Sequence, residues 1–476
     1  MNTVLSLVDF AALSPLFVVL ATALILLLLE CFSKTAAKKY SLFLTALGIV
    51  LAIYAAWAAP ISHNPLLTPW IRFDDLARLF TLLFLSIGLG AALLSDSFFD
   101  RFEASRGEYY FLLLSSLFGL ILVGSAADFL TFFLGLETLS VSLYVLCGYM
   151  KKWQISQESS IKYFLIGSLA AAFLLYGIAL IYGAVGTTRF DALLNGYKAL
   201  TVLSDQRLFL AGIAFVTFGL AFKAAIVPFH TWAPDVYEGA PTPVTAFMAV
   251  GTKAGAFAAF TVIFLYSLPQ FNVLWNECIA LLAFPTLIYA NFVAMKQTQL
   301  RRFFAYSGIS HAGFLLIPLA VGTSEAIPAL VFYLAVYAFA TLGAFAGLSF
   351  LETRQEGVML SDLKGLFKRS PWIAGLISIC LLTLGGIPPT IGFLAKFYLF
   401  KIAFQAGYYS LVIVALFTTI LSAYYYLRIV GIMLSESSTK EEIHPSSWPA
   451  GIVGFVSVIA LIFFSFFPDN LYRILF

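Results

Sequence analysis

The sequence predicts an all-α, polytopic membrane protein with about fourteen transmembrane helices. Of its 476 residues, 61% are hydrophobic and only 11% are charged, a composition typical of integral membrane proteins. Hydrophobic runs long enough to cross a bilayer recur from one end of the chain to the other. Because no long polar stretch remains for a soluble domain, residues 1–476 are expected to form a single integral membrane domain.

The expected spans follow one another with short polar connections. They lie near residues 14–32, 40–59, 76–95, 109–126, 128–148, 159–183, 208–228, 240–266, 274–295, 303–321, 326–350, 371–404, 408–434 and 448–467. No Lys or Arg precedes Lys34, whereas a secretory signal peptide begins with a positively charged region. The first span is therefore expected to be a retained helix.

Two of these helices, the seventh and the twelfth, are expected to be broken at membrane depth. Residues 222–247, FKAAIVPFHTWAPDVYEGAPTPVTAF, contain four prolines, and residues 384–400, LGGIPPTIGFLAKFYLF, contain two. Proline removes an amide donor and clashes with the preceding turn. A broken helix persists in lipid only where its freed backbone groups meet protein or water, and such breaks accompany ion sites in transporters. Each break has a lysine within a few residues, Lys223 and Lys396.

The positions of the two breaks, five spans apart, suggest an internal repeat. Three N-terminal helices (1–108) would precede a first repeat of helices 4 to 8 (109–266) and a second of helices 9 to 13 (274–434), and one last helix would occupy 448–476. An odd number of spans in each unit forces the two copies into opposite orientations. The expected architecture is an inverted repeat of two five-helix units with an ion path at their interface.

Five charged residues lie inside the apolar stretches: Glu137, Lys162, Lys223, Lys253 and Lys396. A charge at the bilayer centre costs roughly 2.5 to 3.5 kcal/mol on insertion scales, so such residues usually face protein or water and mark an ion path. The pattern indicates a conduit for protons or cations.

Glu137 and Lys223 are a candidate gate in this conduit. Glu137 follows Asp128 by nine residues, which places it roughly 13 Å along its helix and near mid-membrane. Desolvation disfavours the charged form of a lone carboxylate or a lone lysine, whereas a pair stabilises both charges. Separating the pair would let the lysine pass its proton along a wire through Lys253, His311 and Lys396, and lysine suits this role because, unlike arginine, it can lose its proton.

Each candidate also has a structural interpretation. Glu137, Lys223 and Lys253 could belong to buried ion pairs that only stabilise the fold, and Lys162 could extend from near a helix end to the membrane surface. His230 could satisfy backbone carbonyls beside a break, and His311 could be a hydrogen-bonded core histidine. The abundant aromatic residues are interpreted as packing surface and interfacial belts.

The sequence carries no pattern for redox, nucleotide or metal chemistry. Its four cysteines stand singly, with no Cys-x-x-Cys or Cys/His cluster for zinc, haem or an iron–sulfur centre, and it lacks a Gly-rich nucleotide loop. No cofactor, metal or nucleic-acid partner is expected, and electron transfer within this chain is not expected.

Loop charges predict the orientation. The loops at 33–39, 96–108, 149–158, 296–302, 351–370 and 428–447 hold 16 Lys and Arg residues, whereas the opposite side holds five. Under the positive-inside rule this asymmetry places the first set in the cytoplasm and both termini on the periplasmic or outer face of the cell inner (plasma) membrane.

Several motifs resemble one family closely over nearly the whole chain. The sequences are FLGLETLSVSLYVLCGY (133–149), SSIKYFLIGSLAAAFLLYG (159–177), LRRFFAYSGISHAGF (300–314) and the two broken segments above. They are similar to the subunit N family of the proton-pumping NADH:quinone oxidoreductase, respiratory complex I. DVYEGAPTPVTAF within residues 235–247 resembles subunit N rather than the antiporter-like subunits L and M.

The resemblance implies a non-redox subunit of a translocase, in which quinone chemistry elsewhere drives a proton path in this chain. It implies proton-translocation roles for seven residues, Glu137, Lys162, Lys223, His230, Lys253, His311 and Lys396. It also implies membrane-arm partners: the antiporter-like subunits M and L, and four others known as K, J, A and H, of which K, J and A are small and H contributes to the quinone site. Two other functions remain open, a subunit of a multi-subunit sodium/proton antiporter and a scaffold of the membrane arm.

Overall fold

The computed structural model describes residues 4–102, 107–269, 272–352, 355, 357–436 and 448–475. The first half contains α1 (Leu7–Ala12), α2 (Ser14–Phe32), α3 (Lys34–Ala58), α4 (Asp75–Phe102), α5 (Gly107–Ser125), α6 (Phe129–Cys147), α7 (Gln154–Val185), α8 (Phe190–Lys198), α9 (Leu203–Lys223), α10 (Trp232–Gly239), α11 (Thr242–Phe247), η1 (Met248–Thr252), α12 (Lys253–Phe260) and η2 (Thr261–Ser267). The second half contains α13 (Asn272–Ala294), α14 (Leu300–Val321), α15 (Ala326–Leu351), η4 (Leu360–Leu363), α16 (Leu366–Arg369), α17 (Pro371–Gly385), α18 (Ile391–Gln405), α19 (Tyr409–Leu434), α20 (Trp448–Phe466) and α21 (Pro468–Leu475).

The predicted fold class, an all-α polytopic membrane protein, is confirmed. Thirteen helices among the described residues are long and apolar enough to cross a membrane. The remaining predicted span, 371–404, is divided into α17 and α18, each of 15 residues. The short helices α1, α8, α16 and α21 were not predicted, because segments of four to nine residues are too short for a hydrophobic period to show.

Both predicted breaks are present. The first separates the end of α9 at Lys223 from the start of α10 at Trp232. The second separates α17 from α18, and Gly386 ends α17 in the left-handed region at φ 71°. A Cβ atom at position 386 would also lie 2.8 Å from Cδ of Lys396, so a glycine is required there both by backbone conformation and by the close side chain.

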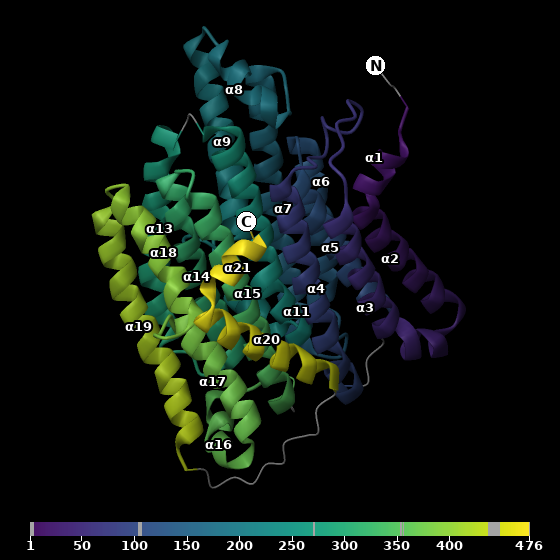
Figure 1. The fold of residues 1–476 in the computed structure, drawn as a ribbon, viewed down its shortest axis with the longest axis vertical. Coiled ribbons are helices and arrows are strands. Elements are labelled where there is room, and N and C mark those ends of the chain that lie inside the picture. Colours follow the sequence, from purple (N-terminus) through teal and green to yellow (C-terminus); the bar gives the residue numbers. More distant parts are fainter. Residues whose placement is uncertain are drawn as a thin grey trace.

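The buried centre of the molecule is built from three helical segments. The segment Thr242–Ser267, which runs through α11, η1, α12 and η2, and α14 are buried along their lengths, and α15 is nearly so. In Figure 1, α2 and α3 lie at one edge and α19 at the opposite edge, with α14 and α15 between them. The edge helices expose many apolar side chains, as lipid-facing helices do, whereas the central segments are buried except near the end of η2, where Tyr266 is exposed.

Two of the segments predicted to face the cytoplasm lie away from α8, which belongs to the predicted opposite side. In Figure 1, α16 lies at the lower end of the bundle and the connection between α2 and α3 lies in its lower half, whereas α8 lies at the upper end. Three residues that contribute to the predicted charge asymmetry, Arg106, Arg354 and Lys440, lie outside the described residues. The division into two inverted repeats stays a prediction.

Candidate functional site

Lys223 and Glu137 lie near one another, but they do not form a direct ion pair. Lys223, at the end of α9, is 4% exposed, and its Nζ donates to Oγ of Ser140 at 2.9 Å and to the hydroxyl of Tyr163 at 3.1 Å. Ser140 lies one turn beyond Glu137 on α6. Oε1 of Glu137 is buried and accepts no hydrogen bond from the described residues, and no ion pair within 4.0 Å joins it to a described lysine. Ser140 and Tyr163 therefore hold the lysine beside a free carboxylate.

Asp128 explains the position of Glu137. The Asp128 side chain accepts hydrogen bonds from the backbone N–H groups of Leu130 and Thr131 and so caps the start of α6. Glu137 follows two and a half turns into the helix.

Aromatic rings connect the first lysine to the second. The ring of Tyr163 stacks on Trp232, with centroids 4.7 Å apart, and Trp232 contacts Tyr237 edge-on at 6.3 Å. The hydroxyl of Tyr237 accepts a hydrogen bond from Nζ of Lys253 at 3.2 Å. The broken segment at α10 therefore supplies the contact between the Lys223 and Lys253 surroundings.

Lys253 lies in an unusual stretch of helix. It begins α12, directly after the π-helical turn η1 and one short helix before the second π-helical segment η2. Such turns are rare and recur at functional sites. A Cβ at Gly308 of α14 would lie 2.8 Å from Nζ of Lys253 and 3.1 Å from the hydroxyl of Tyr337. Glycine at position 308 thus lets the lysine reach the surface of α14.

His311 lies one turn further along α14 and is 4% exposed. Its Nδ1 is 2.7 Å from the hydroxyl of Tyr333, and its Nε2 is 3.3 Å from the hydroxyl of Tyr426. The ring of Tyr337, which lies between the lysine and the histidine, has its centroid 4.8 Å from that of His311. Both ring nitrogens of the histidine therefore have partners that can donate or accept a proton.

Lys396, on α18, is the last of four buried residues that follow one another through the molecule. These four residues, which we call the lysine line, are Lys223, Lys253, His311 and Lys396. Nζ of Lys396 donates to the carbonyl oxygen of Gly385 at 3.0 Å and to Oγ of Ser422 at 3.3 Å, and it lies 4.6 Å from the ring centroid of Phe314. A cavity of about 10 Å³ is lined by both His311 and Lys396. That volume is at the lower limit for one ordered water. The carbonyl of Gly385 is available because α17 ends there, so the break itself binds the lysine.

Three buried lysines are thus held without carboxylates. Among the described residues, no carboxylate oxygen lies within 4.0 Å of Nζ of Lys223, Lys253 or Lys396; hydroxyl groups and one carbonyl bind them instead. Because a hydroxyl can both donate and accept a hydrogen bond, this arrangement can pass a proton.

The structure places Lys162 apart from this line. Its side chain is 44% exposed, and its Nζ contacts Glu158 at 2.7 Å and Asp235 at 3.0 Å. Arg302 joins the same cluster through Asp235 at 2.8 Å and Glu238 at 2.7 Å. No direct contact with Glu137 is present among the ion pairs of the described residues, so the geometry agrees with the alternative that Lys162 extends toward the surface.

His230 also lies outside the line. It sits in the break before α10, where its ring contacts Tyr289 edge-on with centroids 4.8 Å apart. Its Nδ1 is buried and makes no hydrogen bond to a described residue.

Sequence reasoning missed the hydroxyl partners of the line. They are Ser140, Tyr163, Tyr237, Tyr333, Tyr426 and Ser422. Tyr337 lies beside His311, and its hydroxyl donates to the carbonyl of Ala249. The interpretation of the aromatic residues as packing surface and interfacial belts was incomplete, because these tyrosine hydroxyls are buried in the site. The spacing of Tyr333 and Tyr337 could have indicated buried hydroxyl groups, because residues four apart lie on one face of an apolar helix.

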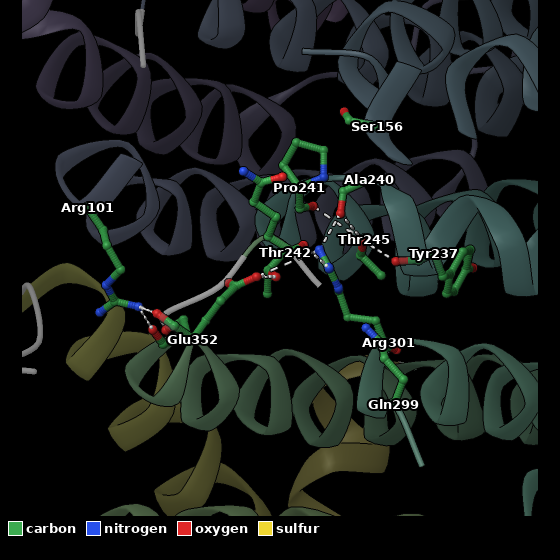
Figure 2. A network of polar contacts seen from close by, with 12 residues as sticks. Arg101, Ser156, Tyr237, Ala240, Pro241, Thr242, Thr245, Gln299, Arg301 and Glu352 are labelled. Carbon is green, nitrogen blue, oxygen red and sulfur yellow. Dashed lines mark hydrogen bonds and ion pairs between the residues drawn. The ribbon is translucent and has the colours of Figure 1, made fainter. Parts of the chain in front are cut away.

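A second buried charge cluster joins the ends of four helices (Figure 2). Arg301, at the start of α14, and Glu352, directly after α15, are each 2% exposed in their side chains and lie 3.7 Å apart. Oε1 of Glu352 accepts from Thr242 at 2.7 Å, and Nη1 of Arg301 donates to the carbonyl of Ala240 at 2.7 Å. Arg101, at the end of α4, donates to the backbone carbonyl of Glu352. The two arginines of this cluster donate hydrogen bonds to backbone carbonyls of different segments, which favours a structural role.

Among the residues that the structure describes, no group of three or more His, Cys, Asp and Glu side chains is arranged to hold a metal ion. The cysteines Cys147 and Cys380 are buried, whereas Cys31 and Cys278 are exposed on the surface rather than packed in the core.

Comparisons with known proteins identify the family of the chain. A family model described as NADH:quinone oxidoreductase/Mrp antiporter matches residues 126–422, which include all seven candidate residues. NADH-quinone oxidoreductase subunit N of Protochlamydia amoebophila is 63% identical over 476 residues, covering 100% of this chain and 99% of that protein.

The fold of the chain is also similar to the folds of solved structures. A chain of respiratory complex I from Thermus thermophilus is 32% identical, with a TM-score of 0.81 over 96% of this chain and 98% of that one. A chain of the Mrp complex from Dietzia sp. has a TM-score of 0.84 at 20% identity, covering 98% of this chain and 96% of that one, which shows a shared fold alone. The full-length identity and the complex I structure together show that this chain belongs to the subunit N family of NADH-quinone oxidoreductase, the antiporter-like membrane subunits of respiratory complex I.

Proposed function

We propose that this chain carries a proton path through the membrane arm of an NADH:quinone oxidoreductase and has no redox chemistry of its own. The observation that supports this most strongly is the line of three buried lysines and one histidine bound by hydroxyls and a carbonyl. A lysine without a carboxylate partner can lose its proton in a buried site, because no fixed anion holds the charge there.

The proposed path runs from Lys223 through Lys253 and His311 to Lys396. Glu137 acts as the gate: when its carboxylate approaches Lys223, the lysine keeps its proton, and when the two separate, as in the described arrangement, the proton moves on. Tyr237 and Tyr337 connect Lys253 to its neighbours, and a water in the small cavity completes the step from His311 to Lys396.

Two candidate residues take peripheral roles in this proposal. Lys162, Asp235 and Arg302 form a half-exposed cluster at α10, the helix that also carries Tyr237. We place proton uptake from the aqueous side at this cluster. His230, with a free Nδ1 in the break, supports proton movement near Lys223 rather than forming part of the main line.

The proposed setting is the cell inner membrane, with the other membrane-arm subunits as partners. These are the antiporter-like M and L, the small K, J and A, and H at the quinone site, where quinone chemistry supplies the energy. We further propose the two inverted five-helix repeats, because each half contains one broken helix with a buried lysine beside the break, Lys223 and Lys396.

The two alternatives fit less well. The Mrp likeness is one of fold at 20% identity, whereas identity to a subunit N is 63% over the full chain, so a sodium/proton antiporter subunit is not favoured. A pure scaffold would gain nothing from buried lysines that lack carboxylate partners, since each costs desolvation free energy.

Two lysines of α18 provide the test. Lys396 is buried, whereas Lys401 is exposed on the same helix. In the assembled complex, Lys396→Ala is expected to reduce NADH-driven proton uptake into inverted membrane vesicles by about tenfold or more, because a relay group is lost. Lys401→Ala should leave uptake unchanged. Equal uptake by both variants, with equal amounts of complex on a native gel, would refute the proposed path.

The membrane topology gives a second prediction, which does not depend on the proton path. In a background without native cysteines, single cysteines at positions 38 and 364 should be labelled by a membrane-impermeant maleimide only from the cytoplasmic side, and one at position 195 only from outside. All three positions are exposed in the structure, so accessibility depends on sidedness alone. The opposite pattern would reverse the faces assigned to proton uptake and release.

A further inference from the structure

A cavity unrelated to the lysine line lies where the loop before α4 meets the ends of α2, α3 and α5. About 50 Å³ of it is open, several times the roughly 10 to 15 Å³ that one water requires. Its polar lining includes Arg72, Asp74, Arg78 and Thr81, and its apolar lining comes from the end of α1, the start of α2, the end of α3, the loop before α4, and single residues of α4 and α5. Two arginines and one aspartate leave this lining with one net positive charge.

The backbone around Arg72 is held in place by the end of α5. The N–H of Arg72 donates to the carbonyl of Ser125 at 2.7 Å, and the N–H of Ala127 donates to the carbonyl of Trp70 at 2.9 Å. Ile71 forms an isolated antiparallel bridge with Ala126 between these two bonds. The position of the arginine is therefore set by the fold and not by a flexible loop.

The Arg72 guanidinium is buried yet only partly satisfied. Its side chain is 10% exposed, its Nη2 donates to the carbonyl of Gly124 at 3.2 Å, and its plane lies over the ring of Tyr266 at 4.8 Å. Nε and Nη1 are buried and donate no hydrogen bond to a described residue, and Asp74 lies 3.6 Å from Nη1. Two donor atoms on a buried cation at a cavity are the arrangement that binds a phosphate or carboxylate group.

The second arginine contributes from the neighbouring helix. Nη2 of Arg78 donates to the carbonyl of Ala59 at 2.8 Å, and its Nη1 lies 3.4 Å from the largely exposed Asp75. Arg78 is thus anchored at the cavity while its charge is only weakly neutralised, because a solvent-exposed partner contributes little.

The cavity lies at the level of the membrane interface. Tyr54 and Trp57 near the end of α3 and Trp70 in the following loop expose large aromatic surfaces, and exposed Tyr and Trp mark the boundary between hydrocarbon and headgroups. Beyond them, α2 and α3 present exposed apolar side chains, among them Phe17 and Leu47, that suit acyl chains. An anion held at this depth, next to such a surface, fits a lipid.

We propose that this cavity binds the phosphate of an anionic phospholipid, with Arg72 and Arg78 as its donors and the acyl chains along α2 and α3. The lipid would fasten the N-terminal helices to α4 and α5 by filling the space between their ends. The site is independent of the proton path, since it shares no residue with the lysine line.

The test uses the full-length chain in detergent with phosphatidylglycerol as the probe. After delipidation, retained lipid is measured by native mass spectrometry for the unaltered chain and for Arg72→Gln, Arg78→Gln and Arg207→Gln. Arg207 is exposed at the start of α9, away from the cavity, and so serves as the charge-matched control. One tightly bound phosphatidylglycerol is expected, with affinity reduced about tenfold or more in the two cavity variants and unchanged in the control, because a charge-assisted hydrogen bond is lost.

Two further measurements identify the ligand. Excess inorganic phosphate should fail to displace the lipid, and phosphatidylcholine should bind more weakly because its headgroup has no net charge. Displacement by phosphate alone would assign the cavity to a free anion and overturn the lipid proposal. Equal lipid retention by all four chains would show a merely water-filled cavity. Because Arg78 is the less buried of the two, its variant keeps the test valid even if Arg72→Gln reduces the yield of folded chain.

Discussion

Lys223→Ala is expected to leave the assembled complex in the membrane and to lower proton pumping by about tenfold or more. Assembly should survive because Lys223 has no carboxylate within 4.0 Å among the described residues, so its removal strands no directly paired charge. Pumping should fall because Lys223 is the first relay group of the proposed path and the partner on which the Glu137 gate acts. Oxidoreductase activity falls with pumping if the two are tightly coupled.

Lys223→Arg separates a relay from a structural role. Arginine keeps the positive charge but does not release its proton, so it should also impair pumping. A purely structural lysine predicts the reverse order, with arginine tolerated and alanine causing loss of the complex. Lys198→Ala, in the exposed part of α8, is the control and should have no effect. The measurements are a native gel, the quinone reductase rate and proton uptake in membrane vesicles. Full pumping by an assembled Lys223→Ala complex would remove Lys223 from the path.

Glu352→Ala is expected to reduce the amount of folded chain severely. Arg301 would remain buried without its counter-ion, and breaking a buried pair on one side typically costs about 3 to 5 kcal/mol. The Thr242 hydroxyl would lose its acceptor as well. The amount of chain in detergent-solubilised membranes and its thermal midpoint by fluorescence would measure the loss.

Two matched variants make the cause of that loss explicit. Glu436→Ala removes a carboxylate that pairs with Lys368 on the exposed surface, and it should have little effect. The double change Arg301→Met with Glu352→Ala removes both buried charges and should recover part of the stability. If Glu352→Ala were as stable as Glu436→Ala, the buried cluster would not hold the four helix ends together.

The apolar runs and the prolines made most of the fold predictable. Helix breaks at 222–247 and 384–400 followed from proline chemistry, which acts locally and is visible in sequence. The π-helical turns around Lys253 were not predictable, because their backbone differs little from an α-helix and depends on packing against α14 and α15.

The buried lysines of the site could be predicted from the sequence, but the hydroxyl groups that bind them could not. A lysine inside an apolar run is rare enough to stand out, which is why Lys223, Lys253 and Lys396 were identified and are buried as expected. Tyr237 and Tyr426 did not stand out, since a tyrosine fits equally well at an interface, in a core or beside a lysine. Lys162 was ambiguous for a related reason: its depth depends on how far α7 extends beyond the membrane, and α7 has 32 residues.

The π-helical turns on both sides of Lys253 have a mechanical consequence. A π turn contains one residue more than an α turn, and moving that extra residue along the helix rotates the intervening side chains by about 100° without unfolding the segment. Lys253 stands between two such turns, η1 and η2, so a shift of register in either would swing its ammonium group away from Tyr237 and the gap at Gly308. A small axial displacement of this helix would therefore rotate Lys253, and the rotation would make or break the hydrogen bonds of its ammonium group.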